Sequence, residues 1–368
     1  LDKRSYWHPH SSENSNESLQ SSSEKSVRNS KEHPIQSKDN DLILYGLNHK
    51  VKFCRMVRRK INGRNRFYLQ LILEGTPYQN PERKIGSEEI GLDVGVGTIA
   101  IVGDTKAELK QFCSELIPNQ KAKRKLQRKL DRSIRATNPN NYNENGTVKK
   151  GSKKWIKSNR YKATSNELAE TDRKLVACRK SLHGKDINEI IAMGTRIQTE
   201  DISYKAWQKM FGKSIQIRAP SMFMSSLKRK AENAGGYIRE FPTQTTKLSQ
   251  ICHICGEAVK KPLSQRWHVC CEIEMQRDLY SAFLAKCIDI RTSSLDIARA
   301  QLLWQGLEPV LSEAVSRAYK TAISGRNPAS FGFNRIQSQS SSLVKPATIV
   351  SEAMDVVIQM DESHRELI

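Results

Sequence analysis

The sequence lacks any apolar run near the ~20 residues that a membrane-spanning helix needs, and its N-terminal region lacks the hydrophobic segment of a signal peptide. It also lacks the Gly-Lys-Ser/Thr ending of a phosphate-binding loop. We therefore expect an intracellular protein with no membrane partner. Residue 1 is Leu rather than Met, so we expect a fragment or a processed chain.

Acidic residues are scarce beside basic ones. The 368 residues include 61 Lys and Arg but only 39 Asp and Glu, which gives a formal charge of +22. The basic residues cluster, and clustered positive charge favours a polyanionic partner, of which nucleic acid is the commonest. A merely soluble basic protein is the alternative. The composition therefore predicts a protein that binds nucleic acid.

The order of residue types along the chain predicts an α/β organisation. Residues 1–42 are rich in Ser, Asn, Lys and Glu with almost no aliphatic residues, so we expect a disordered tail. Asn62-Gly63 predicts a β-hairpin within residues 43–74. Gly95 and Gly97 predict a tight turn between two strands. We predict strands over 89–104, 196–200 and 237–241, and helices over 119–136, 165–194, 220–235, 278–289 and 295–322.

Three acidic residues stand at the ends of predicted elements. Asp93 follows an apolar strand start, Glu200 ends a short strand, and Asp278 begins a helix. Carboxylates placed in this way can converge and hold Mg²⁺ against a phosphodiester. Each has a structural alternative, because Asp93 could sit in a turn and the other two could cap helices. The nearest rivals for the same roles are Asp104, Asp186 and Asp201.

A group of cysteines lies between the second and third carboxylates. Cys252 and Cys255 form one knuckle of a tetrahedral zinc site, because two thiolates two residues apart can bind one ion. The second half is irregular, with Cys271 as one ligand and either Cys270 or His268 as the fourth. Free thiols, or a site that has lost its metal, are the alternative. We expect the remaining cysteines, Cys54, Cys113, Cys178 and Cys287, to fill the core.

The predicted helix over 119–136 is strongly basic. Leu126, Leu130 and Ile134 give it one narrow apolar stripe. Such a helix suits a groove wall that grips phosphates, and a nearby tryptophan could stack on unpaired bases. An ordinary solvated helix face is the alternative. The candidate nucleic-acid-binding residues are Lys121, Lys123, Arg124, Lys125, Arg128, Lys129, Arg132, Arg135, Lys153, Lys154 and Trp155.

Taken in order, these motifs resemble the TnpB (OrfB) proteins of insertion sequences, which are relatives of the type V CRISPR effector nucleases. The similarity spans about residues 45–325, and the seven-residue step from Cys271 to Asp278 is specific. One departure is Glu272, where the family usually has Gly. The matching stretches are Gly91-Leu92-Asp93-Val94-Gly95, Glu200-Asp201-Ile202-Ser203, Cys252-x-x-Cys255-Gly256 and Arg277-Asp278-x-x-Ser281-Ala282.

The resemblance implies an RNase H-like (RuvC) mixed sheet in an α/β fold, with a helical insertion, a zinc ribbon and a partial β wedge domain. It implies RNA-guided cleavage of DNA by two Mg²⁺ held by Asp93, Glu200 and Asp278, with Zn²⁺ as a structural ion. DNA and a guide RNA are the implied partners, in the cytoplasm at the nucleoid of a prokaryote. The alternatives are a truncated or decayed copy that only binds nucleic acid, and a strand-transferring transposase.

On this pattern the chain divides into six parts. We expect a disordered tail over 1–42, a wedge hairpin over 43–84, a RuvC-like core over 85–245 with an insertion at 112–190, a zinc ribbon over 246–274, C-terminal helices over 275–325, and an irregular tail over 326–368.

Overall fold

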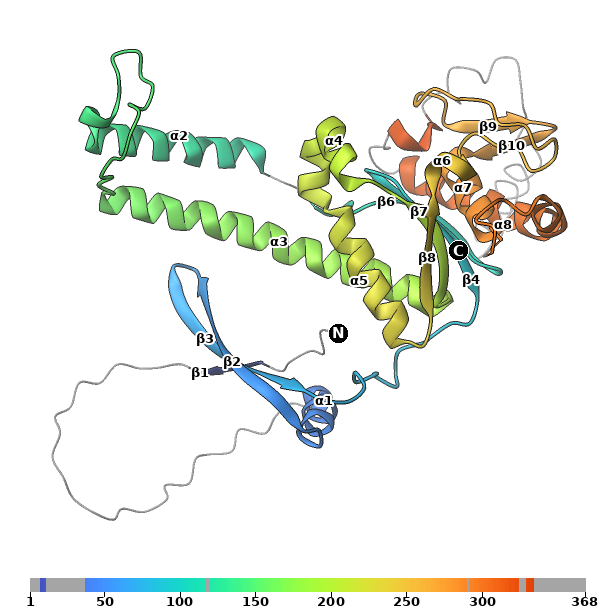
Figure 1. The fold of residues 1–368 in the computed structure, drawn as a ribbon, viewed down its shortest axis with the longest axis horizontal. Coiled ribbons are helices and arrows are strands. Elements are labelled where there is room, and N and C mark those ends of the chain that lie inside the picture. The colour runs from blue at the N-terminus through green and yellow to red at the C-terminus, as the bar shows by residue number, and fades with distance from the viewer. Residues whose placement is uncertain (1–6, 11–36, 117–118, 290, 324–328, 334–368) are drawn as a thin grey trace, which may run out of the picture. The chain divides into compact units, whose positions relative to one another are not determined.

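The computed structural model describes residues 7–10, 37–116, 119–289, 291–323 and 329–333 (Figure 1). The chain divides into two compact units. Unit 1 comprises Leu1–Ile90, Cys113–Ile197 and Ser203–Arg239, and unit 2 comprises Gly91–Phe112, Gln198–Ile202 and Glu240–Ile368. The boundaries cross the predicted core of 85–245, so residues 91–112 and 198–202 pack with the C-terminal part of the chain.

A five-stranded sheet carries the strands on which two of the candidate carboxylates lie. Its order is β6-β5-β4-β7-β8, and β4, β5 and β6 pair antiparallel. Every residue of β5 is buried. The predicted fold class is confirmed, although β6 was not foreseen. The bounds are β4 Glu89–Val94, β5 Thr98–Val102, β6 Ala107–Gln111, β7 Arg196–Asp201 and β8 Tyr237–Pro242.

Two helices of unit 2 pack on this sheet. Helix α7 (Arg277–Lys286) contacts β5, and α8 (Ile297–Ile323) contacts β6. A side chain at Gly91 would place its Cβ 1.9 Å from the carbonyl oxygen of Ala282. Only glycine therefore allows β4 and α7 to approach this closely. Gly91, two residues before Asp93, thus allows two elements that carry candidate carboxylates to pack together.

The turn between β4 and β5 has a different basis from the one predicted. The strands are joined as expected, with the Gly95 N–H donating to the Thr98 carbonyl at 2.8 Å. However, neither Gly95 nor Gly97 adopts a positive φ. The turn therefore does not depend on the conformational freedom of these two glycines.

A three-stranded sheet of order β1-β3-β2 opens unit 1. Its strands are β1 Trp7–His10, β2 Val51–Ile61 and β3 Arg64–Leu73, and α1 spans Ser37–Leu47. Asn62 at φ 50° and Gly63 at φ 78° confirm the predicted hairpin turn. The predicted disorder over 1–42 is wrong for residues 7–10 and 37–42, because β1 pairs with β3 and α1 begins at Ser37. Residues 1–6 and 11–36 lie outside the described residues.

Helices make up the rest of unit 1. The predicted basic helix is α2 (Gln120–Thr137), which contacts α3 (Asn159–Met193) and carries a half-buried apolar stripe. The amide of Asn138 ends α2 by donating to the carbonyls of Ile134 and Ile156. Helix α5 (Pro220–Asn233) was predicted, whereas α4 (Tyr204–Arg218) was not.

Short elements complete the described chain. They are the helix α6 (Thr243–Thr246), the hairpin strands β9 (Trp267–Cys270) and β10 (Ile273–Gln276), and the 3-10 helices Pro139–Asn141 and Ala329–Phe331. The predicted irregular tail over 326–368 thus contains one 3-10 turn, and residues 334–368 lie outside the described residues. Among the described helices, none has the length and apolar character to cross a membrane.

Candidate functional site

The three predicted carboxylates all belong to unit 2. Asp93 lies in β4 opposite Ala100 of β5. Glu200 lies near the end of β7, the other neighbour of β4 in the sheet. Asp278 lies in the first turn of α7, which packs on β5. All three side chains are half-buried, so the tertiary fold brings three distant segments to one region of one unit.

The electrostatics of Asp93 place the other two carboxylates within range of it. Burial raises the pKa of Asp93 well above its ordinary value, and the charges of Asp278 and Glu200 raise that pKa further. The charge of Arg277 opposes this shift. Negative charges that destabilise one another in a partly buried site favour a bound cation, because a cation removes the repulsion.

Glu200 and Asp278 have different environments. Burial raises the pKa of Glu200 to about 7, against a backbone hydrogen bond with Leu248 that lowers it. Asp278 accepts a hydrogen bond at 3.1 Å from the hydroxyl of Thr98, which fixes one of its oxygens. The Nε of Arg277 lies 3.8 Å from the other oxygen of Asp278. A site of this composition can bind divalent metal while keeping one carboxyl close to neutral before the metal arrives.

Capping does not account for these carboxylates. Gln276 is the N-cap of α7, and its side chain accepts the Leu279 N–H at 2.9 Å. Ser203 is the N-cap of α4 and accepts the N–H of Ala206. Asp93 lies within a strand rather than in a turn. Asp93 is therefore not a turn residue, and neither Glu200 nor Asp278 is a helix cap.

The three rival aspartates lie in other settings. Asp104 forms an ion pair of 2.6 Å with Lys286, whose side chain is 1% exposed. Asp186 belongs to unit 1, and Asp201 is exposed at the end of β7. Sequence reasoning missed Thr98 and Leu248 as partners of the carboxylates. No motif could have identified them, because their contacts depend on which strands and loops become neighbours.

The four cysteines form a compact cluster. The sulfurs of Cys252, Cys255, Cys270 and Cys271 all lie within 4.8 Å of one another. The sulfurs of Cys255 and Cys270 are 3.7 Å apart, and those of Cys270 and Cys271 are 3.6 Å apart. Four thiolates at ~2.3 Å from a tetrahedral Zn²⁺ stand about 3.8 Å apart. The cluster therefore has the size and the donor set of a closed, four-thiolate metal site.

Adjacent cysteines can share one site here because the backbone reverses at them. Cys271 has φ 49° and Glu272 has φ 66°, both in the left-handed region. Hydrogen bonds with neighbouring thiols raise the pKa of Cys270 to about 12, and the largest part of this shift comes from the Cys271 thiol. A bound cation would stabilise the thiolate forms that these neighbours disfavour. Glu272 adopts a conformation that glycine takes without strain.

His268 does not belong to the sulfur cluster. Its ring stacks on Tyr280 with ring centroids 4.0 Å apart, and its Nδ1 lies 2.6 Å from the Nζ of Lys261. The geometry therefore favours Cys270 over His268 as the fourth ligand. Of the four scattered cysteines, Cys113 and Cys287 are buried as expected. Cys54 and Cys178 are exposed, so the expectation that they fill the core is wrong.

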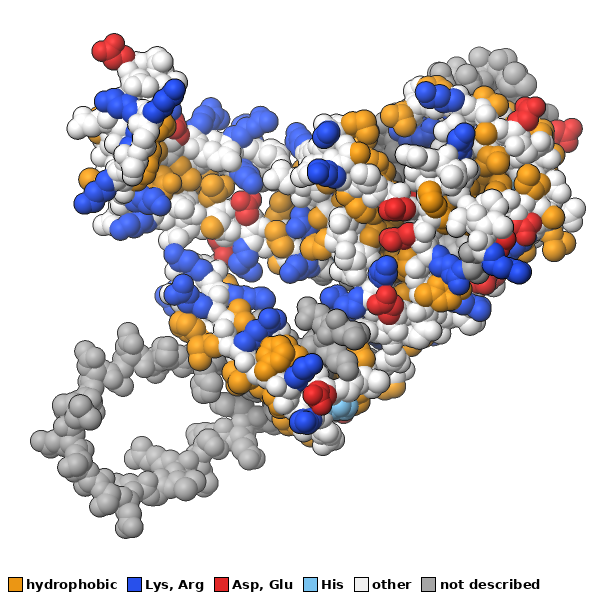
Figure 2. Space-filling model, in the orientation of Figure 1, with side chains coloured by type: hydrophobic (Ala, Val, Ile, Leu, Met, Phe, Trp, Pro, Cys, Tyr) orange, Lys and Arg blue, Asp and Glu red, His pale blue; other side chains and the backbone are white. Residues whose placement is uncertain are grey.

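Figure 2 shows Lys and Arg side chains gathered over α2 and the loop after it. These basic residues divide into two groups by their contacts. Lys123 pairs with Asp172 at 2.8 Å, and Arg135 pairs with Asp131 at 2.9 Å and lies over the ring of Tyr142. These two cations support the local fold. The other candidate cations form no ion pair within the part of the chain that the structure describes. Two of them, Lys129 and Lys153, are half-buried, and the exposed ones are Lys121, Arg124, Lys125, Arg128, Arg132 and Lys154.

Trp155 is 38% exposed and packs edge-on against Tyr142, with ring centroids 5.8 Å apart. Tyr142 in turn contacts the guanidinium of Arg135, which also donates to the carbonyl of Gly146. The loop therefore holds a partly exposed aromatic ring beside the basic helix. An exposed ring beside cations is the arrangement that proteins use to bind single-stranded nucleic acid.

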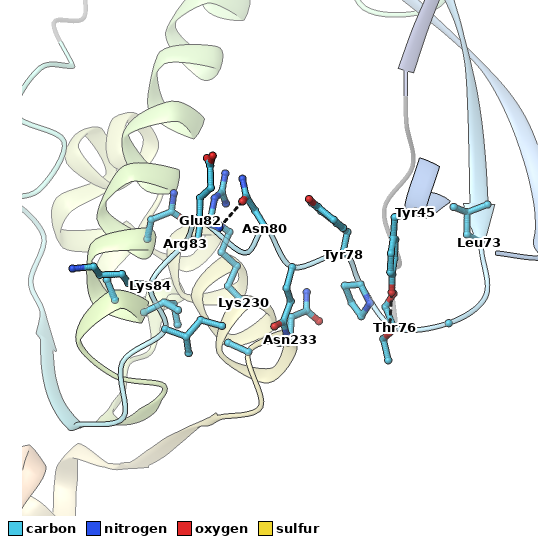
Figure 3. Close-up of a pocket in the computed structure, with 18 of the residues that line it drawn as sticks. Tyr45, Leu73, Thr76, Tyr78, Asn80, Glu82, Arg83, Lys84, Lys230 and Asn233 are labelled. Atoms are coloured by element: carbon cyan, nitrogen blue, oxygen red, sulfur yellow. Dashed lines mark hydrogen bonds between the residues drawn. The ribbon is translucent and has the colours of Figure 1, made fainter. Parts of the chain in front are cut away.

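Unit 1 also encloses a pocket of about 650 Å³ (Figure 3). Tyr45 and Tyr78 line it with their ring centroids 5.3 Å apart, and the Tyr45 hydroxyl donates to the carbonyl of Thr76. Lys230 lines it from α5 and donates to Asn188. None of the three candidate carboxylates lines this pocket.

Comparisons with known proteins agree with the sequence resemblance over one segment. Residues 221–284 match the family described as Cas12f1-like, TNB domain. This segment includes the four clustered cysteines and Asp278, and the match confirms the resemblance to relatives of the type V effectors there. No curated protein matches the chain.

Two solved structures are similar to the chain at low identity. One is a Cas12f1–sgRNA–target DNA complex, at 15% identity and a TM-score of 0.42, with 69% of this chain and 48% of that chain covered. Another is a CRISPR–Cas12f ternary complex, at 15% identity and a TM-score of 0.34, with 68% of this chain and 47% of that chain covered. The chain thus spans about half the length of the proteins in these structures.

Proposed function

We propose that this protein is an RNA-guided DNA endonuclease of an insertion-sequence element, which hydrolyses phosphodiesters at a RuvC-like site. The observation that carries the proposal is that β4, β7 and the first turn of α7 bring three half-buried carboxylates into one unit, where the charges of Asp278 and Glu200 raise the pKa of Asp93. A buried carboxylate that is repelled by two other negative charges is costly for a protein to keep unless a cation binds there. The match of residues 221–284 to a Cas12f1-like domain supports the same assignment.

Asp93, Glu200 and Asp278 are the residues that would hold two Mg²⁺. When bound, these ions would supply Lewis-acid stabilisation of the phosphoryl oxygens and lower the pKa of an attacking water. Thr98 orients Asp278 through the hydrogen bond from its hydroxyl. Arg277 lies next to Asp278, and its positive charge lowers the pKa of Asp93, which opposes the effect of the neighbouring carboxylates. The exposed cations of α2 would bind the phosphates of DNA or of a guide RNA without reading sequence.

The four cysteines would hold Zn²⁺ as a structural ion. The donor set is soft and complete, with four sulfurs and no position for a water ligand, which is the composition of structural rather than catalytic zinc. Such an ion would fix the fold of the segment that leads into α7, because β10 connects Cys270 and Cys271 to the first turn of α7 and Asp278.

The proposal is tested by a cleavage assay with the full chain. Purified protein is incubated with RNA transcribed from the region beside its reading frame, with DNA that matches the guide, and with Mg²⁺. We expect cleavage that requires all three components and that is lost in Asp93→Asn. Asp201→Asn is the matched control, because Asp201 is exposed at the end of β7, and it should cleave normally. Cleavage that survives in Asp93→Asn refutes the proposed site.

Nucleic-acid binding without cleavage is the second candidate function. The exposed cations of α2 favour it, because they belong to unit 1 and do not depend on the carboxylates of unit 2. Tight, salt-dependent binding with no Mg²⁺-dependent cleavage would support it. DNA products joined to a target strand would instead indicate a strand-transferring transposase.

A further inference from the structure

The side chain of Tyr280 contacts a residue from each half of the cysteine segment. Tyr280 is fully buried and lies two residues after Asp278, in the same helix. Its hydroxyl accepts the N–H of His253 at 3.1 Å and lies 2.7 Å from the Nδ1 of that histidine. His268 stacks on the face of its ring. One histidine from each cysteine knuckle therefore contacts the same tyrosine.

The same tyrosine is tied to the first cysteine knuckle through the backbone. His253 directly follows Cys252, so the backbone N–H that the Tyr280 hydroxyl accepts belongs to the residue next to a sulfur ligand. Trp304 of α8 packs edge-on against the ring of Tyr280, with ring centroids 5.8 Å apart. A buried hydroxyl that bonds the neighbour of a ligand residue is an outer-shell group, and such groups orient metal ligands.

A second set of contacts ties the cysteine segment to the start of α7. The guanidinium of Arg277 donates to the carbonyls of Pro262 and Gln265, at 3.2 and 2.8 Å, and its backbone N–H donates to Arg266. These acceptors lie in the loop that joins the two knuckles. Asp278 follows Arg277 directly and is held from the sheet by Thr98. The first turn of α7 is therefore clamped between the sheet and the cysteine segment.

We infer that Tyr280 is a positioning residue that couples the metal held by the four cysteines to the carboxylate of Asp278. This inference rests on the proposed function. Tyr280 touches neither the substrate nor the catalytic ions. It acts by holding α7 against a segment whose conformation depends on the cysteine-bound metal. Loss of that metal, or of the tyrosine hydroxyl, then loosens the first turn of α7 and weakens divalent-ion binding at the carboxylates.

The test compares Tyr280→Phe with a matched control in the full chain. Tyr319→Phe removes a hydroxyl from α8. The ring of Tyr319 packs against Phe333, and its hydroxyl forms no hydrogen bond with the described residues. Zinc release to a chromogenic chelator measures the cysteine site, and the binding of Mn²⁺, followed by electron paramagnetic resonance, measures the carboxylate site. We expect Tyr280→Phe to weaken both by roughly 10- to 100-fold, as for other outer-shell changes. Tyr319→Phe should match the wild type.

The outcomes separate the coupling from the proposed function. Normal zinc retention and Mn²⁺ binding in Tyr280→Phe, or faster zinc loss with normal Mn²⁺ binding, would overturn the coupling. If Tyr280→Phe does not fold, wild-type protein depleted of zinc takes its place, and Mn²⁺ binding that survives depletion overturns the coupling. Wild-type protein that holds zinc but binds no Mn²⁺ refutes the proposed function itself, and the coupling fails with it.

Discussion

Glu200→Gln should stabilise the protein while removing its metal-dependent function. The pKa of Glu200 rises from an ordinary 4.5 to about 7 because the side chain is buried. Because the pKa of Glu200 is higher in the folded state than in the unfolded state, its favourable contribution to folding stability is complete below pH 4.5. That contribution is lost as the pH rises through 7. At pH 8 the charged carboxylate therefore destabilises the metal-free fold, and glutamine removes that penalty.

The size of the effect follows from the pKa. A shift from 4.5 to about 7 corresponds to about 3 kcal/mol at a pH above both values. Because solvent reaches a half-buried side chain, we expect between about 1 and 3 kcal/mol. For a folding unit of this size, 1 kcal/mol changes the melting temperature by about 2 to 4 °C. Glu200→Gln should therefore raise the melting temperature at pH 8 by about 2 to 12 °C.

The assay is thermal unfolding followed by calorimetry between pH 5 and pH 8, with zinc-loaded protein in buffer without Mg²⁺. We expect the difference between Glu200→Gln and wild type to be small at pH 5 and to grow towards pH 8. Glu240→Gln is the control, because Glu240 is exposed on β8 of the same sheet, and it should give no such trend. Adding Mg²⁺ should stabilise the wild type but not Glu200→Gln. A variant that is less stable than wild type at pH 8 would refute the reasoning.

The remaining predictions concern the other parts of the site. Thr98→Val removes the hydroxyl that donates to Asp278, and we expect cleavage to slow by about fivefold, since such a bond contributes about 1 kcal/mol; an unchanged rate contradicts this role. Cys270→Ser should lower bound zinc below one ion per chain by elemental analysis, whereas His268→Phe should retain it; the opposite result would make His268 the ligand. Arg128→Gln should weaken nucleic-acid binding and reduce the salt slope by about 0.9, measured by fluorescence anisotropy; an unchanged slope would place Arg128 outside the interface.

Several features followed from the sequence because they depend on local chemistry. Asn62-Gly63 fixes a hairpin turn, since both residues adopt the left-handed backbone that this turn needs. Asn138 ends α2 because its amide satisfies a helix carbonyl within its reach. The Cys252–Cys255 spacing predicted half of the sulfur cluster for the same reason. Each of these signals needs only a few consecutive residues.

Other features were missed because they depend on contacts between distant segments. Helix α4 has no fully buried residue, and it is kinked at Phe211. The β1 strand exists only as a partner of β3, and a four-residue strand has too few positions to show a pattern. The second half of the sulfur cluster looked irregular because its geometry depends on two left-handed residues rather than on ligand spacing.

The sequence by itself determined which chemical groups are available, in which order, and which local turns and helix ends form. Only the tertiary structure decided which of those groups meet. Asp93, Glu200 and Asp278 share one region because β4 lies between β5 and β7, and because Gly91 lets α7 approach the sheet. Cys270 rather than His268 joins the sulfurs because Tyr280 holds the histidine ring. Local propensity acts over a few residues, whereas these pairings depend on packing between elements that are not neighbours in the sequence.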